Sequence, residues 1–240
     1  MNAVLASEIL KMRRSSIQWV VLASSGIPFL LSAADLALQG GGLPGRQAAL
    51  QSNAEIWALG AFLTLVLTAC HVFSREYQGD TIQSLFATPH HPLPFLLAKL
   101  LVTVLVLAAA MLLSLAARFL GALLLATGPW DPAFLRSYVG RIGLYILQFA
   151  LLTPWIGLIG IVAKKMFTAF LVSFGFIVLL FPFSQTDHYW LFPHLVPVVH
   201  FSKTIGFDSG YRAFAAPGWI SLAVFFLLTL GLCMALFRRR

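Results

Sequence analysis

The sequence predicts an all-α membrane protein that crosses the bilayer six times, with both termini in the cytoplasm. Three observations lead to this fold class: an apolar composition, six long apolar stretches and an uneven distribution of basic residues. Hydrophobic residues make up 60% of the chain, charged residues only 10%, and the mean hydropathy is +0.89. These values exclude an ordinary soluble domain and indicate a chain with several membrane crossings.

The apolar stretches are of the length that a helical bilayer crossing needs, which is about 20 residues. We expect a single membrane domain over residues 1–240, with an interfacial helix at residues 1–16 and a long outer segment at residues 184–216. The six predicted transmembrane helices are residues 17–38, 53–73, 95–126, 137–163, 166–183 and 217–237.

Basic residues gather on one side of these spans. Cytoplasmic loops of membrane proteins carry an excess of Lys and Arg, so this side is predicted to be cytoplasmic. It holds Lys11, Arg13, Arg14, Arg75, Lys99, Lys164, Lys165, Arg238, Arg239 and Arg240. The opposite side holds Arg46, Arg136, Arg141, Lys203 and Arg212, with Arg118 close to it. The pattern predicts an N-in, C-in topology and accounts for the net charge of +8 without a nucleic-acid partner.

The first sixteen residues have the pattern of a helix that lies on the membrane surface. Leu5, Ile9 and Met12 share one helical face. Basic residues that can bind headgroups follow in the same segment, and Glu8 is its only acid. An amphipathic basic helix of this kind lies in the interface and does not span the bilayer.

A second amphipathic helix is predicted at residues 80–87, between the second and third spans. Gly79 can end the preceding helix, and Asp80 with Gln83 forms the pattern of a capping box. Pro89 ends the helix, because the residue before a proline is disfavoured in the α region.

Three apolar side chains, Ile82, Leu85 and Phe86, fall on one face of this short helix. A compact apolar face at the membrane surface suits docking onto another protein. Contact with lipid headgroups is the alternative interpretation of the same face.

Patterns of catalysis and metal binding are missing from the sequence. His188, His194 and His200 recur at intervals of six, which fits neither one helix face nor the usual spacing of metal ligands, so we predict no metal site. Interfacial histidines in an aromatic belt are the alternative. No acid lies at the centre of a predicted span, which speaks against an intramembrane hydrolase and an ion-coupled carrier. If the chain moves a solute, a separate subunit must supply the energy.

Two features of the spans have two interpretations each. Arg118 and Arg141 could line a polar pathway, or they could extend to the interface as anchors. Gly157 and Gly160 could permit close helix packing, or they could be ordinary glycines of a membrane helix.

The order of these features resembles the permease subunits of type V, or ABC-2-type, ATP-binding-cassette exporters, in particular the bacitracin-resistance and lantibiotic-immunity permeases. The resemblance covers the whole chain. It is carried by Ser7–Arg14, by Arg75–Ile82, by Ala87–Pro89 and by Leu97–Leu101 at the start of the third span. The Gly79-Asp80 pair departs from the turn expected there and leaves the start of the short helix open by one or two residues.

The resemblance implies a role for each amphipathic helix. Residues 80–87 would be the cytoplasmic coupling helix, seated in a groove of an ATPase subunit. Its docking residues would be Arg75, Glu76, Asp80, Thr81, Ile82, Leu85 and Phe86. The N-terminal helix would be the connecting helix beside it, with Glu8, Lys11, Arg13 and Arg14.

The resemblance also implies the partners and the cargo. This chain would bind no cofactor, whereas a separate ABC ATPase would bind ATP and Mg. A second permease, identical or related, would pair with it in the bacterial plasma membrane, and residues 184–216 would form an extracellular re-entrant cap. The expected cargo is an amphipathic or hydrophobic compound, such as an antimicrobial peptide, a lipid-linked molecule or a drug. The alternative is a stand-alone membrane enzyme or carrier that acts through the outer loop.

Overall fold

The computed structural model describes residues 2–13, 15, 18–19, 22–23, 26–27, 30–31, 34, 45–78, 92–180, 182–183, 186, 188–202 and 216–238. Over these ranges the prediction of an all-α fold is confirmed, because they contain helices and turns but no strand. The elements are α1 (Asn2–Arg13), α3 (Arg46–Gln51), α4 (Ala54–Gln78), α6 (Pro92–Leu125), α7 (Pro132–Leu151), α8 (Thr153–Ala163), α9 (Met166–Leu180), η2 (Tyr189–Leu191), α10 (Val196–Ser202) and α11 (Ala216–Arg238).

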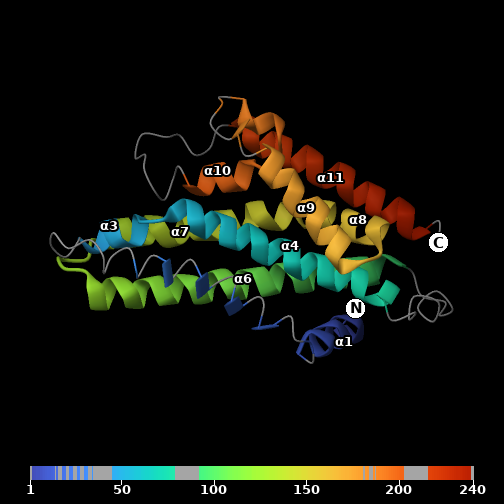
Figure 1. The fold of residues 1–240 in the computed structure, drawn as a ribbon, viewed down its shortest axis with the longest axis horizontal. Coiled ribbons are helices and arrows are strands. Elements are labelled where there is room, and N and C mark those ends of the chain that lie inside the picture. Colours follow the sequence, from blue (N-terminus) through green and yellow to red (C-terminus); the bar gives the residue numbers. More distant parts are fainter. Residues whose placement is uncertain are drawn as a thin grey trace.

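Helix α4 lies at the centre of the bundle, where it packs against α6, α8, α9 and α10 (Figure 1). One end of the bundle holds α1, the C-terminal end of α4 and the N-terminal end of α6, and we call it the α1 end. The other end holds α3 and the first turn of α7, and we call it the α3 end. The C-terminal end of α11 lies toward the α1 end (Figure 1).

Four helical segments of the described residues are long and apolar enough to cross a membrane. They are Arg46–Arg75, Leu93–Leu125, Pro132–Ala163 and Ala216–Leu236. Helix α9 is apolar but shorter, and most of the predicted first span, residues 17–38, lies outside the described residues, as does the predicted coupling helix, residues 80–87. The chain is therefore a multi-pass membrane protein, whereas the number of six spans and the N-in, C-in orientation stay predictions.

The predicted fourth span consists of two helices. It begins at Pro132, five residues earlier than expected, because Asp131 caps it by accepting a hydrogen bond from the backbone N–H of Ala133 at 2.9 Å. Helix α7 ends at Leu151, and α8 starts at Thr153. Pro154 lacks a backbone N–H and cannot continue the hydrogen-bond ladder of α7, which explains the break.

Gly157 and Gly160 allow α8 to approach α4 closely. A Cβ atom added at Gly157 would lie 2.9 Å from Cζ of Phe73, and one added at Gly160 would lie 3.0 Å from Cβ of Phe73. Any larger residue at either position would collide with this phenylalanine, which is itself buried. Of the two interpretations of these glycines, close packing is the one that the structure supports.

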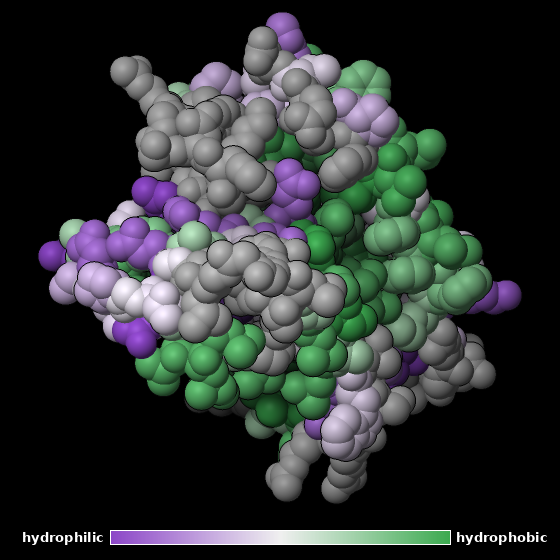
Figure 2. All heavy atoms as spheres, turned by 60° about the vertical axis from the view of Figure 1, so that its left-hand side comes forward, coloured by the Kyte–Doolittle hydropathy of each residue, from purple (hydrophilic) through white to green (hydrophobic). Residues whose placement is uncertain are grey.

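Apolar side chains cover much of the outer surface. Figure 2 shows hydrophobic residues over a wide part of the face in view, with hydrophilic residues grouped mainly toward its edges. Leu124 of α6 and Phe167 of α9 are each 71% exposed, and only 17% of the most apolar window of α11 is buried. In a membrane protein such surfaces face lipid or another subunit, so α11 is a peripheral helix.

Candidate functional site

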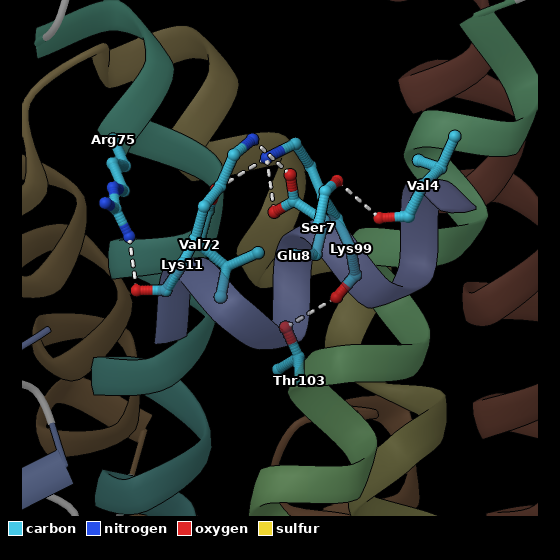
Figure 3. A network of polar contacts seen from close by, with 8 residues as sticks. All are labelled: Val4, Ser7, Glu8, Lys11, Val72, Arg75, Lys99 and Thr103. Carbon is cyan, nitrogen blue, oxygen red and sulfur yellow. Dashed lines mark hydrogen bonds and ion pairs between the residues drawn. The ribbon is translucent and has the colours of Figure 1, made fainter. Parts of the chain in front are cut away.

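At the α1 end, a cluster of charged side chains fastens α1 to the membrane helices (Figure 3). Glu8 of α1 is only 4% exposed, and its carboxylate lies between two ammonium groups. Oε1 lies 2.5 Å from Nζ of Lys11, and Oε2 lies 3.4 Å from Nζ of Lys99. A buried carboxylate needs such partners, because burying an unpaired charge costs several kcal/mol.

Lys99 joins three helices through one side chain. It belongs to α6, is 1% exposed, and approaches Glu8 of α1. Its ammonium group also donates a hydrogen bond of 3.0 Å to the backbone carbonyl of Val72 in α4. This ammonium group therefore links α1, α4 and α6 at one point, in addition to the packing of α6 against α1 and α4.

Further contacts tie the C-terminal part of α1 to α4. Nη1 of Arg75 donates a hydrogen bond of 2.8 Å to the backbone carbonyl of Lys11, one of the last carbonyls of α1. Carbonyls at a helix C-terminus have no partner within the helix, and a guanidinium group is a favourable one. Just beyond α1, Oγ of Ser15 lies 3.0 Å from Nε2 of His71 in α4.

The cluster borders the predicted coupling segment on both sides. Helix α4 ends at Gln78, three residues after Arg75, and α6 begins at Pro92, seven residues before Lys99. Of the predicted docking residues, the structure places only the side chain of Arg75; Asp80, Thr81, Ile82, Leu85 and Phe86 lie outside the described residues, and so does the side chain of Glu76. Of the predicted connecting-helix residues it places Glu8 and Lys11 together, whereas the side chains of Arg13 and Arg14 lie outside the described residues.

The charges of the cluster lower the pKa of the Glu8 carboxyl below its ordinary value of 4.5. Burial alone would raise this pKa, but the ammonium groups of Lys99 and Lys11 favour the carboxylate more strongly. The folded chain therefore binds this proton more weakly than the unfolded chain. The stabilisation is present at neutral pH and is lost as the pH falls below 4.5 and through the lower pKa of the folded state.

We expect acid to release α1. When the pH falls from about 6 to about 3, a range that includes the ordinary pKa of a carboxyl group, the thermal midpoint of the purified protein should fall less in Glu8→Gln than in the wild type. Glu55→Gln, a change at an exposed acid of α4, is the matched control and should keep the wild-type slope. Equal slopes for wild type and Glu8→Gln would contradict the role of this carboxylate.

At the α3 end, Arg118 binds the end of a short helix. Its Nη2 donates hydrogen bonds to the carbonyls of Leu50, at 2.6 Å, and Ser52, at 2.5 Å, at the C-terminus of α3. The guanidinium carbon lies 4.9 Å from the centre of the Trp57 ring, a cation–π contact. Arg118 is 4% exposed, and its guanidinium group contacts both α3 and Trp57. Arg141 lies partly buried in α7, and a pathway role for either arginine stays a prediction.

A chain of aromatic and polar contacts links Trp57 to the outer segment. The ring centres of Trp57 and Phe201 are 4.9 Å apart, and those of Phe201 and Tyr145 are 4.7 Å apart. His200, beside Phe201 in α10, is fully buried; its Nδ1 lies 3.0 Å from Nε2 of Gln148, and its Nε2 lies 2.9 Å from the hydroxyl of Tyr189. These contacts hold α10 and η2 against α4 and α7.

The other two histidines of the outer segment lie apart from these contacts. His188 is exposed, whereas His194 is buried and stacks on Trp155 of α8, with ring centres 5.5 Å apart. Burial lowers the pKa of His194 to about 4, so its ring is neutral at physiological pH.

Sequence reasoning missed how Lys99 and His200 are used. The charge pattern places Lys99 only among the basic residues of one membrane side, although the single acid of the N-terminal helix is a signal that a cation lies near it. The partner could not be chosen from the sequence, because Lys99 is 91 residues away from Glu8. For His200 the sequence offers an interfacial belt as the alternative to a metal site, and nothing in its spacing points to Gln148 or Tyr189.

Residues 4–181 of the chain match a protein family described as ABC-2 family transporter protein. The matched part runs from α1 through α9 and includes the charged cluster at the α1 end; η2, α10 and α11 follow it. No curated protein matches the chain.

Proposed function

Because the chain belongs to the ABC-2 family of transporter proteins, we propose that it is the membrane subunit of an ATP-driven exporter. A family match over residues 4–181 makes the chain a permease of an ABC transporter, a transport subunit and not an enzyme, and it implies an ABC ATPase as partner. The observation that carries the proposal is the Lys99 contact, which joins α1, α4 and α6 on both sides of residues 79–91.

The coupling helix of the proposal is residues 80–87, seated in a groove of the ATPase. Its apolar residues Ile82, Leu85 and Phe86 make the contact, with Arg75 and Glu76 just before it. Helix α1 is the connecting helix. Closure of the ATPase on ATP would move the coupling helix, and the ion pair between Glu8 and Lys99 would carry α1 along with α4 and α6. ATP and Mg would be bound by the partner.

The complete transporter of the proposal has two permease chains and two ATPase subunits in a bacterial plasma membrane. Each permease has six spans with both termini in the cytoplasm. That both termini lie on one side of the membrane is supported by the position of α1 and of the C-terminal end of α11, which lie toward the same end of the bundle (Figure 1); the excess of basic residues favours the cytoplasm as that side. The apolar, weakly charged helices favour an amphipathic or hydrophobic cargo, such as an antimicrobial peptide, a lipid-linked compound or a drug, over a sugar or an ion.

The docking face can be tested by purification of the tagged chain from membranes in mild detergent. We expect a soluble ATPase with nucleotide-binding motifs to co-purify with the wild type. Replacement of Ile82, Leu85 and Phe86 by Ser should abolish the co-purification, because removal of one buried anchor at an interface commonly costs about 2 kcal/mol, roughly a thirtyfold loss of affinity.

Leu124→Ser is the matched control, since it removes an exposed leucine of α6 near the α3 end. It should leave the co-purification unchanged. Recovery of the wild-type chain alone, still active in membranes without ATP, would refute the exporter and favour a stand-alone enzyme or carrier. An ATPase that still binds the triple variant would refute only the assigned docking face.

A further inference from the structure

The turn between α8 and α9 presents two lysines. Helix α8 ends at Ala163 and α9 begins at Met166, so Lys164 and Lys165 form the whole connection. Both side chains are exposed. Among the residues that the structure describes, neither side chain has a hydrogen-bond or ion-pair partner, so both ammonium groups are available to a ligand.

The residues that flank this turn are apolar and exposed. Val162, two residues before Lys164, is 62% exposed, and Phe167, two residues after Lys165, is 71% exposed. In a multi-pass membrane protein, apolar side chains this exposed lie at the depth of the acyl chains. A connection of two residues cannot extend far from the end of the apolar helices, so the two ammonium groups lie at the level of the lipid headgroups.

The backbone of the turn does not favour lysine at either position. Lys164 has φ +57°, in the left-handed region, where glycine avoids the steric cost that a side chain incurs. Its backbone N–H donates a hydrogen bond of 3.1 Å to the carbonyl of Gly160, which glycine would do equally well. The carbonyl of Lys165 accepts the first hydrogen bond of α9, and a positive charge is unfavourable at a helix N-terminus.

We infer that Lys164 and Lys165 form a binding site for the phosphate of an anionic phospholipid headgroup. Two adjacent cations at headgroup level are complementary to this ligand, and each lysine near an anionic membrane surface strengthens binding roughly fivefold. The exposed apolar side chains of Val162 and Phe167, on either side of the turn, favour a lipid over the acidic surface of a protein. They belong at the depth of the acyl chains, so the turn itself lies among the headgroups.

The test compares thermal midpoints in nanodiscs of phosphatidylcholine, with and without phosphatidylglycerol. We expect phosphatidylglycerol to raise the midpoint of the wild type. The rise should shrink in Lys164→Gln and in Lys165→Gln, and it should shrink most in the double variant. Arg136→Gln, a change at an exposed arginine of α7 near the α3 end, is the matched control and should keep the full rise.

Lys164→Gly separates the side chain from the backbone. It removes the left-handed lysine, so in phosphatidylcholine alone its midpoint should exceed that of the wild type by roughly 2–4 °C. Its response to phosphatidylglycerol should nevertheless be smaller. Lysines that only strain the turn would give the first effect without the second, and this result would overturn the site.

Two further outcomes would also overturn the lipid site. Inorganic phosphate, added to phosphatidylcholine nanodiscs, would reproduce the rise if free phosphate were the ligand. An undiminished phosphatidylglycerol effect in the double variant, together with loss of ATPase co-purification, would assign the two lysines to the ATPase.

Discussion

Lys99→Met is expected to destabilise the purified protein and to detach α1. The substitution leaves the Glu8 carboxylate buried with Lys11 as its remaining ion-pair partner, and it removes the hydrogen bond to the carbonyl of Val72. Loss of one partner from a buried ion pair costs about 3 kcal/mol, which corresponds to roughly 6–12 °C in the thermal midpoint of a chain of this size. Limited trypsin digestion should also cleave near Arg13 and Arg14 sooner than in the wild type.

Two variants separate the ion pair from the packing of the methionine. Lys99→Arg keeps the positive charge and should retain most of the stability. Glu8→Met combined with Lys99→Met removes both charges and should recover the midpoint, because an apolar pair of similar volume replaces a buried ion pair at little or no cost. A single Lys99→Met variant with the midpoint and the digestion pattern of the wild type would refute the seating of α1 by this lysine.

Arg118→Met is the second substitution with a large expected effect. It leaves the carbonyl of Ser52 without its guanidinium donor and removes the cation–π contact with Trp57, while Leu50 keeps the hydroxyl of Tyr138 at 2.9 Å. A buried polar group that loses its partner costs about 1–3 kcal/mol, and the lost cation–π contact adds to it. We expect the free energy of unfolding to fall by about 3 kcal/mol, and the thermal midpoint to fall with it.

Arg118→Lys should lie between wild type and Arg118→Met, since an ammonium group keeps the charge but cannot reproduce the planar geometry of the guanidinium group. Arg136→Gln, on the same end of the protein, should change the midpoint little because its side chain is exposed. A pathway role for Arg118 makes the opposite prediction: transport would fall in Arg118→Met while the midpoint stayed that of the wild type.

The helices could be predicted because their cause is local. Apolar runs of about 20 residues identified the segments around α4, α6 and α11 within a few residues. The start of α7 was misplaced although its signal was present, since Asp131-Pro132 is a favourable N-cap followed by proline at the first helical position. The sequence does not show the break at Leu152, because an apolar run has the same pattern whether or not its helix is interrupted. Pro154 alone does not decide between a kink and a new helix.

The contacts between helices could be predicted only in kind. The pattern Gly157-x-x-Gly160 left close packing as one of two interpretations, and it gave no sign of Phe73, the residue in contact, which lies 84 positions before Gly157. The ion pair of Glu8 with Lys99 and the contact of Arg118 with α3 depend in the same way on tertiary structure. A single sequence can indicate which charged side chains need a partner, but the partner itself is determined by the tertiary structure.

The continuity of α4 has a mechanical consequence. Its 25 residues form one helix, roughly 37 Å long, with Val72 near one end and Trp57 near the other. The neighbouring segment that α7 and α8 form is interrupted at Leu152. Helix α4 is therefore continuous and stiff, whereas α7 and α8 can bend relative to each other at Leu152. We therefore expect a tilt imposed on α4 beside Lys99 to move Trp57 at its other end and Phe201 of α10, which Trp57 contacts, whereas the break at Leu152 allows α8 to tilt without the whole of α7.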